Sequence, residues 1–248
     1  MPLVEFETHG PVALIRLNRP ELRNAVNLAL TGELRAALAR LEGDTTLRAA
    51  VLTGAGRFFC AGMDLGAFAA GERPGLGDPD HFAGFVAARR SKPIIAAVNG
   101  GAVAGGFEIV LACDMVIAEE GAIFSLPEVK RGIIAAGGGA FRLPRRLPAA
   151  IAAEMLLTGD PITADRAAAL GLVNSVVPGA ELIATALALA GRVAANAPLA
   201  VRLTREVAQE AEDWTRSDAA WAQIDVSADA LEGARAFKEK REPQWTGR

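Results

Sequence analysis

The sequence predicts a protein of the α/β class with a largely parallel sheet, followed by a helical C-terminal region. Short, almost continuous apolar runs alternate with longer segments of helical period, and Gly, Asn or Pro closes several of the runs. With 248 residues, 51% of them hydrophobic, the chain can bury a large core. Because the strand pattern stops near residue 180, we expect a core over residues 1–180 and a helical region over 181–248.

The expected elements follow this pattern in chain order. Strands are predicted at 12–17, 49–53, 93–98, 115–118, 122–125 and 171–177. Apolar spacing of three and four predicts helices at 27–41, 181–195 and 199–212, with the segment 214–237 and a polar tail after them. Residues 69–80, AAGERPGLGDPD, are rich in Gly, Pro and charge, so we expect a mobile surface loop that could serve as a lid.

The charge balance and the cysteines narrow the protein class. The net charge is −3 and no arginine- or lysine-rich block occurs, which argues against a nucleic-acid partner. The two cysteines, Cys60 and Cys113, lie in apolar contexts and are expected to be reduced packing residues. Neither a signal peptide nor an apolar run long enough for a bilayer is visible. We therefore expect a cytoplasmic protein with no membrane partner.

The candidate catalytic residues lie between Asn99 and Gly139. Glu108 follows Gly105 at a predicted helix start, where free N–H groups favour a developing negative charge. Glu128 follows a proline at the end of an apolar run. Apolar neighbours suggest that Glu108 is buried, and a buried carboxyl needs a partner or a raised pKa. Both glutamates also fit a plain structural role, in which an acidic residue complements a helix dipole, so spacing alone leaves both readings open.

Other catalytic arrangements find little support. The only histidines, His9 and His81, lie near the terminus and in the polar loop, where solvated surface residues are expected. The sequence contains no G-x-S-x-G elbow, no metal-ligand spacing, no Walker loop and no tyrosine. An acid/base site built from carboxylates is the remaining candidate, and no metal site is predicted.

Three ordered motifs resemble the enoyl-CoA hydratase (crotonase) superfamily. They are LTGAGRFFCAGMDL, KPIIAAVNGGAVAGGFEIVLACD and FSLPEVKRGIIAAGGGAFRL, with RPELRNAVN near the start resembling the family's first loop. The resemblance covers nearly the whole chain. It implies a spiral of ββα units with a helical C-terminal region that assembles as homotrimers or hexamers. It also implies an acyl-CoA thioester substrate and no separate cofactor.

The resemblance also implies roles for individual residues. The backbone N–H groups of Met63 and Gly105 would form an oxyanion hole for the thioester carbonyl, and Glu108 and Glu128 would hold a water between them. A further set would contact CoA or substrate. Its members are Ala61, Asp64 and Leu65, with Arg23 and Lys238 at the phosphates.

The stretch after Glu128 departs from the family pattern. Ala135-Ala136 stands where hydratases of the family usually have Pro-Gly, so a side chain replaces a glycine near the reacting water. Residues 126–166 also resemble carnitinyl-CoA dehydratases. The expected activity is hydration of an enoyl-CoA. The alternatives are a Δ3,Δ2-enoyl-CoA isomerase, a carnitinyl-CoA dehydratase-like enzyme and a non-catalytic acyl-CoA binder.

Overall fold

The computed structural model describes residues 1–75, 78–208, 223 and 226–248, and it contains a six-stranded sheet. The strand order is β1-β2-β3-β4-β6-β9, in which β1 and β2 form an antiparallel hairpin and the other pairs are parallel. Gly10 turns the hairpin with a φ of 57°. The bounds are β1 Val4–His9, β2 Val12–Leu17, β3 Ala49–Gly54, β4 Ile94–Val98, β6 Met115–Glu119 and β9 Ser175–Val177.

A second, smaller sheet lies beside the first. It has the order β5-β7-β8, from β5 (Gly101–Val103), β7 (Ile123–Ser125) and β8 (Ile162–Thr163). Strands β5 and β7 are parallel and in register, with Val103 opposite Ser125. Because parallel strands end at the same edge, the segments that follow β5 and β7 leave the sheet side by side.

The helices surround these sheets. Their bounds are α1 Leu28–Gly43, α2 Leu65–Ala69, α3 Gly105–Ala112, α4 Gly139–Arg146, α5 Ala149–Thr158, α6 Ala164–Ala169, α7 Leu182–Ala194, α8 Pro198–Ala208 and α10 Ala228–Glu239. The described residues also include four 3-10 helices: η1 Pro20–Leu22, η2 Phe82–Gly84, η3 Pro127–Arg131 and η4 Gly179–Glu181.

The larger sheet is covered on both faces. On one face, Leu30, Leu34 and Leu41 of α1 join the main core together with α3. On the other, α7 packs on β2, β3, β4 and β6. Ala186, Ala190 and Ala194 recur every four residues on α7 and are buried, so small side chains let this helix lie close to the sheet.

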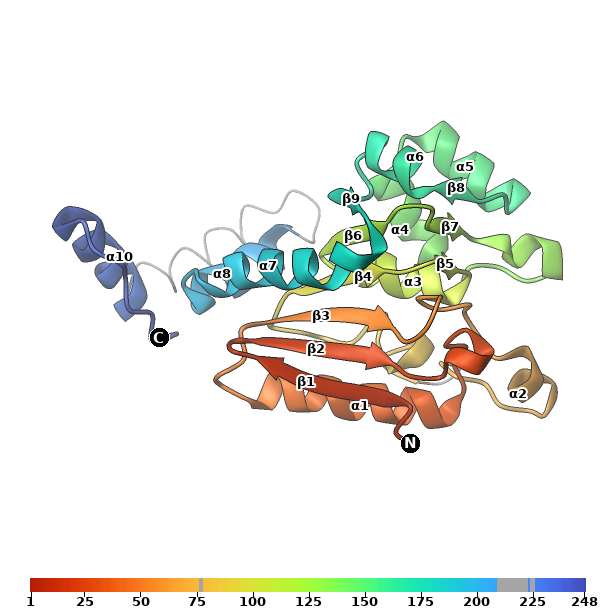
Figure 1. The fold of residues 1–248 in the computed structure, drawn as a ribbon, viewed down its shortest axis with the longest axis horizontal. Helices are drawn as coiled ribbons and strands as arrows, with labels where there is room; N and C mark the ends of the chain where they lie inside the picture. Colours follow the sequence, from red (N-terminus) through yellow and green to blue (C-terminus); the bar gives the residue numbers. More distant parts are fainter. Residues whose placement is uncertain (76–77, 209–222, 224–225) are drawn as a thin grey trace.

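Beyond α7, which lies on the larger sheet, α8 and α10 extend away from the sheets, and the C-terminus lies beside α10 (Figure 1). Within the described ranges, no single helix is long and apolar enough to cross a membrane. One bent pair of helices, Gly179–Ala194 with Pro198–Ala208, has the length and composition of a membrane span, and only these two properties support such a span.

The predicted elements agree with the observed ones except for short segments. Helix α1 begins after Asn27, whose side chain accepts the N–H of Leu30. The strand predicted at 171–177 is confined to Ser175–Val177, because a turn with Gly171 at a φ of 81° precedes it. Helix α8 is described as far as Ala208. Of the predicted segment 214–237, residues 214–222 and 224–225 lie outside the described residues, and α10 covers the part from Ala228.

Candidate active site

The N-terminus of α3 is the centre of the site. Gly105 is the first helical residue, so its N–H has no acceptor within the helix. Ala104, which precedes it, has a φ of 51° and a ψ of −129°, a conformation that is strained for alanine. A Cβ added at Gly106 would lie 2.1 Å from the carbonyl oxygen of Cys60. Glycine at 106 therefore allows α3 to start directly against the 60–63 segment.

The segment that carries Met63 lies against this helix start. Met63 forms an isolated parallel bridge with Val26, in which the Val26 N–H donates to Gly62 O (2.8 Å) and the Asp64 N–H donates to Val26 O (2.9 Å). In such a bridge the N–H of the central residue points away from its partner. A Cβ added at Gly62 would lie 2.9 Å from the Gly105 nitrogen, so the two segments are in close contact.

Glu108 lies in the first turn of α3 and is 4% exposed. Its Oε1 accepts the N–H of Gly139 at 2.9 Å. Burial raises the pKa of Glu108, while the N–H groups of Gly139 and Gly137 and the charge of Arg142 oppose this rise. A Cβ added at Gly137 would lie 2.5 Å from Oε2, so the glycine turn closes tightly around the carboxyl group.

Glu128 lies in η3 and is 6% exposed. Its buried Oε2 has no hydrogen-bond partner among the described residues. Burial raises the pKa of Glu128 to about 7. Its own backbone N–H opposes this rise, and the charge of Glu108 adds to it. The register of β5 and β7 explains why Glu108 and Glu128 interact, because α3 follows β5 and η3 follows β7. The Ala104 N–H donates to Ser125 O at 2.9 Å and joins the two strand ends.

Of the predicted CoA contacts, Ala61, Asp64 and Arg23 lie in loop segments near the start of α3, and Leu65 is the first residue of α2. The Ala61 N–H donates to Arg23 O at 3.0 Å, which joins the first loop to the 60–65 segment. Arg23 and Leu65 are exposed. Lys238 belongs to α10, and its side chain lies outside the described residues.

Asp64 has a structural role that sequence reasoning did not predict. Its Oδ1 accepts the N–H groups of Gly66 (2.9 Å) and Ala67 (3.1 Å) at the start of α2, and its Oδ2 pairs with Nη1 of Arg19 at 2.6 Å. The Ala67 N–H and the Arg19 guanidinium lower the pKa of Asp64. Asp64 therefore anchors α2 to the first loop.

Sequence reasoning also missed two side chains at the site, Phe82 and Arg142. A Cβ added at Gly105 would lie 2.3 Å from Cε1 of Phe82, so this ring covers the first residue of α3. Arg142 holds the glycine turn around Glu108. Phe82 lies outside the quoted motifs, and Arg142 lies within the third motif but has no role assigned by it, because both residues reach the site through tertiary packing.

Of the unusual alanines, only Ala135 is buried. It is 6% exposed, and a Cβ added at Gly139 would lie 3.0 Å from its Cβ. Ala136 is exposed, and its N–H donates to Ile134 O at 2.8 Å. The two cysteines are buried and unbonded to each other.

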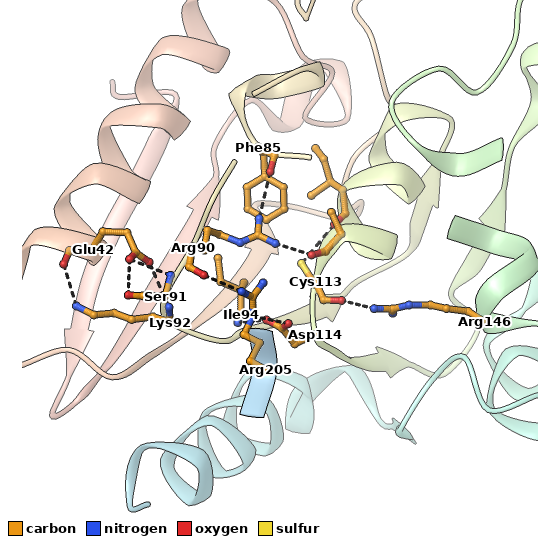
Figure 2. Close-up of polar contacts among 12 residues, drawn as sticks. Glu42, Phe85, Arg90, Ser91, Lys92, Ile94, Cys113, Asp114, Arg146 and Arg205 are labelled. Atoms are coloured by element: carbon orange, nitrogen blue, oxygen red, sulfur yellow. Dashed lines mark hydrogen bonds and ion pairs between the residues drawn. The ribbon is translucent and has the colours of Figure 1, made fainter. Parts of the chain in front are cut away.

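The opposite end of α3 is held by arginines (Figure 2). Arg90 is 8% exposed, and its guanidinium donates to Phe85 O (3.2 Å) and Ala112 O (2.5 Å). Arg146 donates to Cys113 O. Cations at a helix C-terminus complement its dipole, so both ends of α3 are fixed.

The chain is similar to a known protein family and to curated relatives over nearly its whole length. The family model described as "Enoyl-CoA hydratase/isomerase" matches residues 7–248. A carnitinyl-CoA dehydratase of Proteus mirabilis is 44% identical over 99% of this chain and 98% of its own length.

Two solved structures are similar over 100% of both chains. An enoyl-CoA hydratase from Mycobacterium tuberculosis has a TM-score of 0.94 at 44% identity. A carnitinyl-CoA hydratase from Mycobacterium avium has a TM-score of 0.81 at 45% identity. The fold expected from the sequence motifs is thus confirmed, and the chain belongs to the enoyl-CoA hydratase/isomerase (crotonase) family.

Proposed function

We propose that this protein is a hydro-lyase that adds water reversibly across the 2,3 double bond of a trans-2-enoyl-CoA. The observation that carries the proposal is the pair of buried carboxyl groups, Glu108 and Glu128, which interact electrostatically next to the N-terminus of α3. Two carboxyls with raised pKa values in an apolar site are suited to divide the roles of base and acid.

In the proposed reaction the thioester oxygen accepts hydrogen bonds from the N–H groups of Met63 and Gly105. Negative charge develops on that oxygen as water attacks Cβ. Both donors belong to fixed backbone, so they need little reorganisation, and one such donor is typically worth about 3 kcal/mol in the barrier. The positive end of the α3 dipole acts in the same direction.

The two glutamates take different roles because their surroundings differ. Glu108 accepts the N–H of Gly139 and faces the charge of Arg142, which favour its ionised form, so it orients and deprotonates the water. Glu128 has a carboxyl oxygen without a partner among the described residues and a pKa of about 7, so it holds the proton that is delivered to Cα.

The remaining assignments belong to the same proposal. Ala61, Asp64 and Leu65 line the CoA site, with Arg23 and Lys238 at its phosphates. CoA enters as part of the substrate, and the residues assigned here need no metal or redox cofactor for this reaction. The helical C-terminal region is proposed to assemble the chain as a homotrimer or hexamer in the cytoplasm.

A second candidate is the dehydration of carnitinyl-CoA. The observation that favours it is the name of the curated relatives, which are carnitinyl-CoA dehydratases at 41–44% identity over nearly the full chain. The chemistry is the reverse of hydration and uses the same residues. Ala135-Ala136, at the position where many hydratases have Pro-Gly, is the feature through which the substrate could differ.

A panel of CoA esters tests both candidates. If the protein is an enoyl-CoA hydratase, the enoyl absorbance should fall with straight-chain enoyl-CoAs of at least one length. A rise in enoyl absorbance with carnitinyl-CoA would instead select carnitinyl-CoA dehydration. If neither occurs and no 3-enoyl-CoA is isomerised, while CoA esters still bind, the protein is a non-catalytic acyl-CoA binder and the enzyme proposal fails.

The variant Glu108→Gln separates hydration from isomerisation. We expect hydration to fall by about 1,000-fold or more, because the water loses its base. A Δ3,Δ2-isomerase would largely survive, because Glu128 alone can move a proton between carbons. Preserved hydration in Glu108→Gln would contradict the assigned role.

A further inference from the structure

Arg142 is joined to the glycine turn that surrounds Glu108. Its Nη1 donates to Gly137 O at 3.1 Å, and its Nη2 donates to Val86 O at 2.6 Å. The guanidinium therefore bridges the turn to the segment that follows η2. A Cβ added at Gly138 would overlap this guanidinium, at 2.0 Å from Nη1, so the turn and the arginine fit closely.

The turn in question binds Glu108 directly. Gly138 has a φ of 106°, which few residues other than glycine adopt, and the next N–H, that of Gly139, donates to Oε1 of Glu108 at 2.9 Å. Arg142 thus holds one carbonyl of a turn whose N–H groups hold the carboxyl. The charge of Arg142 also acts on Glu108 across the gap between α4 and α3.

We propose that Arg142 is a positioning residue for Glu108, which fixes the Gly137–Gly139 turn and keeps the carboxylate oriented as the base of the reaction. The proposal rests on the proposed function for its kinetic consequences and on geometry for its structural ones. Arg142 acts through the turn and by charge, without contact to the reacting atoms.

Among the groups whose charge acts on Arg142, Glu108 is the anion. The other groups whose charge acts on Arg142 are cations, namely Arg90, Arg145 and Arg146. Glu108 in turn interacts with Glu128 on η3. Removal of the Arg142 charge should therefore raise the pKa of Glu108, because burial then acts with less opposition.

The experiment compares Arg142→Gln, Arg142→Lys and the control Arg145→Gln. Arg145 has the same charge on the same helix and is exposed. In Arg142→Gln, kcat for the best enoyl-CoA should fall by about 100-fold with KM little changed, because the base is misplaced while CoA binding is intact. The acidic limb of the pH profile should move up by about 1 unit.

The lysine variant separates charge from geometry. Arg142→Lys should keep the acidic limb in place but recover kcat only in part, because a single ammonium nitrogen cannot take the places of both Nη1 and Nη2 of the rigid guanidinium. Arg145→Gln should match the wild type. The proposal is overturned if Arg142→Gln loses thermal stability alone, with kcat and the pH profile equal to those of Arg145→Gln.

A second measurement does not depend on turnover. NMR titration of the Glu108 carboxyl carbon should give a higher pKa in Arg142→Gln than in the wild type. If the wild type turns over no enoyl-CoA, the proposed function fails, and a higher Glu108 pKa in the variant still supports the positioning role. Equal pKa values in the two proteins would overturn it.

Discussion

Glu128 is a residue that the fold accommodates at a cost to stability. Its carboxyl group is 6% exposed, one oxygen has no hydrogen-bond partner among the described residues, and its pKa is raised from 4.5 to about 7. A carboxyl with a raised pKa prefers to be protonated in the folded state. Folding therefore opposes the ionisation that occurs freely in the unfolded chain.

The pH dependence of stability should follow from this shift. Below pH 4.5 both states are protonated and no cost arises. As the pH rises from 4.5 to about 7, the unfolded state ionises first, so the free energy of unfolding falls and then levels off. Glu128→Gln cannot ionise, so at pH 8 it should be more stable than the wild type by about 2–3 kcal/mol, with little difference at pH 4.

Urea unfolding at pH 4 and pH 8 measures this difference. Glu154→Gln, on the exposed surface of α5, serves as the matched control for loss of a negative charge and should show no such pH-dependent gain. An equal effect of both variants at pH 8 would show that Glu128 ionises in the folded state as readily as a surface carboxyl.

At the residue scale the sequence predicts which side chains are involved better than it predicts what they contact. The motifs identify Glu108 and Glu128, and the apolar neighbours of Glu108 predict its burial. The group that binds Glu108 is the Gly139 N–H, 31 residues away, and the residue that holds that turn is Arg142. Such contacts depend on how α3 and α4 pack, which no local pattern specifies.

At the scale of elements, the start of α3 depends on close approach of two backbones. Gly106 has ordinary helical geometry, so its requirement for glycine comes from packing, because an added Cβ would lie 2.1 Å from Cys60 O. The bridge between Cys60 and Ala102 fixes the same segment from the side of β5. The helix and the 60–63 segment therefore move only together.

Gly106→Ala should push α3 and the 60–63 segment apart. We expect a loss of about 2–3 kcal/mol in the free energy of unfolding, because the overlap is with backbone that cannot rotate away. Hydration activity should fall as well, because the N–H of Gly105 shifts. Both are measured by urea unfolding and by steady-state turnover of the best enoyl-CoA.

Gly32→Ala provides the control for this experiment. Gly32 lies inside α1, and a Cβ there would have no atom within 4 Å. This variant should gain about 0.5–1 kcal/mol of stability from reduced freedom of the unfolded chain, with activity unchanged. A Gly106→Ala variant with unchanged free energy of unfolding and unchanged activity would show that α3 can shift without cost to either.

Elements with a continuous apolar run or a clear helical period could be predicted from the sequence, whereas β1, α4, α5 and the shortest strands, β5 and β8, were not predicted. Strands β3 and β4 are continuous apolar runs and α1 has a clear period, so their positions agree with expectation within a few residues. Strands β5 and β8 have three and two residues, too few for any period to develop. Yet the β5–β7 register brings together the two segments that carry the interacting carboxyl groups, Glu108 and Glu128.

At the scale of the whole molecule, the C-terminal region is attached to the core through α7 and α8 among the described elements. Helix α7 lies on the sheet through its alanine face. Helix α8 is attached through Arg205, whose Nε donates to Oδ1 of Asp114 (2.7 Å) and whose Nη1 donates to Arg90 O (2.7 Å) (Figure 2). Arg90 in turn holds the C-terminal end of α3, so the attachment of α8 is continuous with the helix that carries Glu108.

Sequence patterns predict these C-terminal helices, whereas the attachment is visible only in three dimensions. Arg205 and Asp114 are 91 residues apart, and neither stands out among the charged residues of the chain. Their side chains are only 11% and 14% exposed. The Oδ2 of Asp114 also accepts the N–H of Ile94, the first residue of β4. The ion pair therefore links α8, β4 and the segment before β6.

The last prediction tests this link by comparing two arginines of the same helix. Arg205→Met should reduce the free energy of unfolding by about 3 kcal/mol, because it removes a largely buried ion pair to Asp114 together with the hydrogen bond to Arg90 O. Arg202 pairs with Glu206 across one helical turn, at 3.0 Å with exposed fractions of 34% and 46%. Arg202→Met should therefore cost only about 0.5 kcal/mol, since exposed pairs are well screened by water.

Salt dependence and activity distinguish the two positions further. The effect of Arg202→Met should vanish at 1 M salt, where the screening length is about 3 Å, whereas the effect of Arg205→Met should largely persist. Because Arg205 also binds Arg90 O, Arg205→Met should loosen the C-terminal end of α3 and lower kcat, measured on a preparation whose far-UV circular dichroism matches the wild type. Equal costs for the two substitutions would mean that α8 is held to the core by its apolar contacts alone.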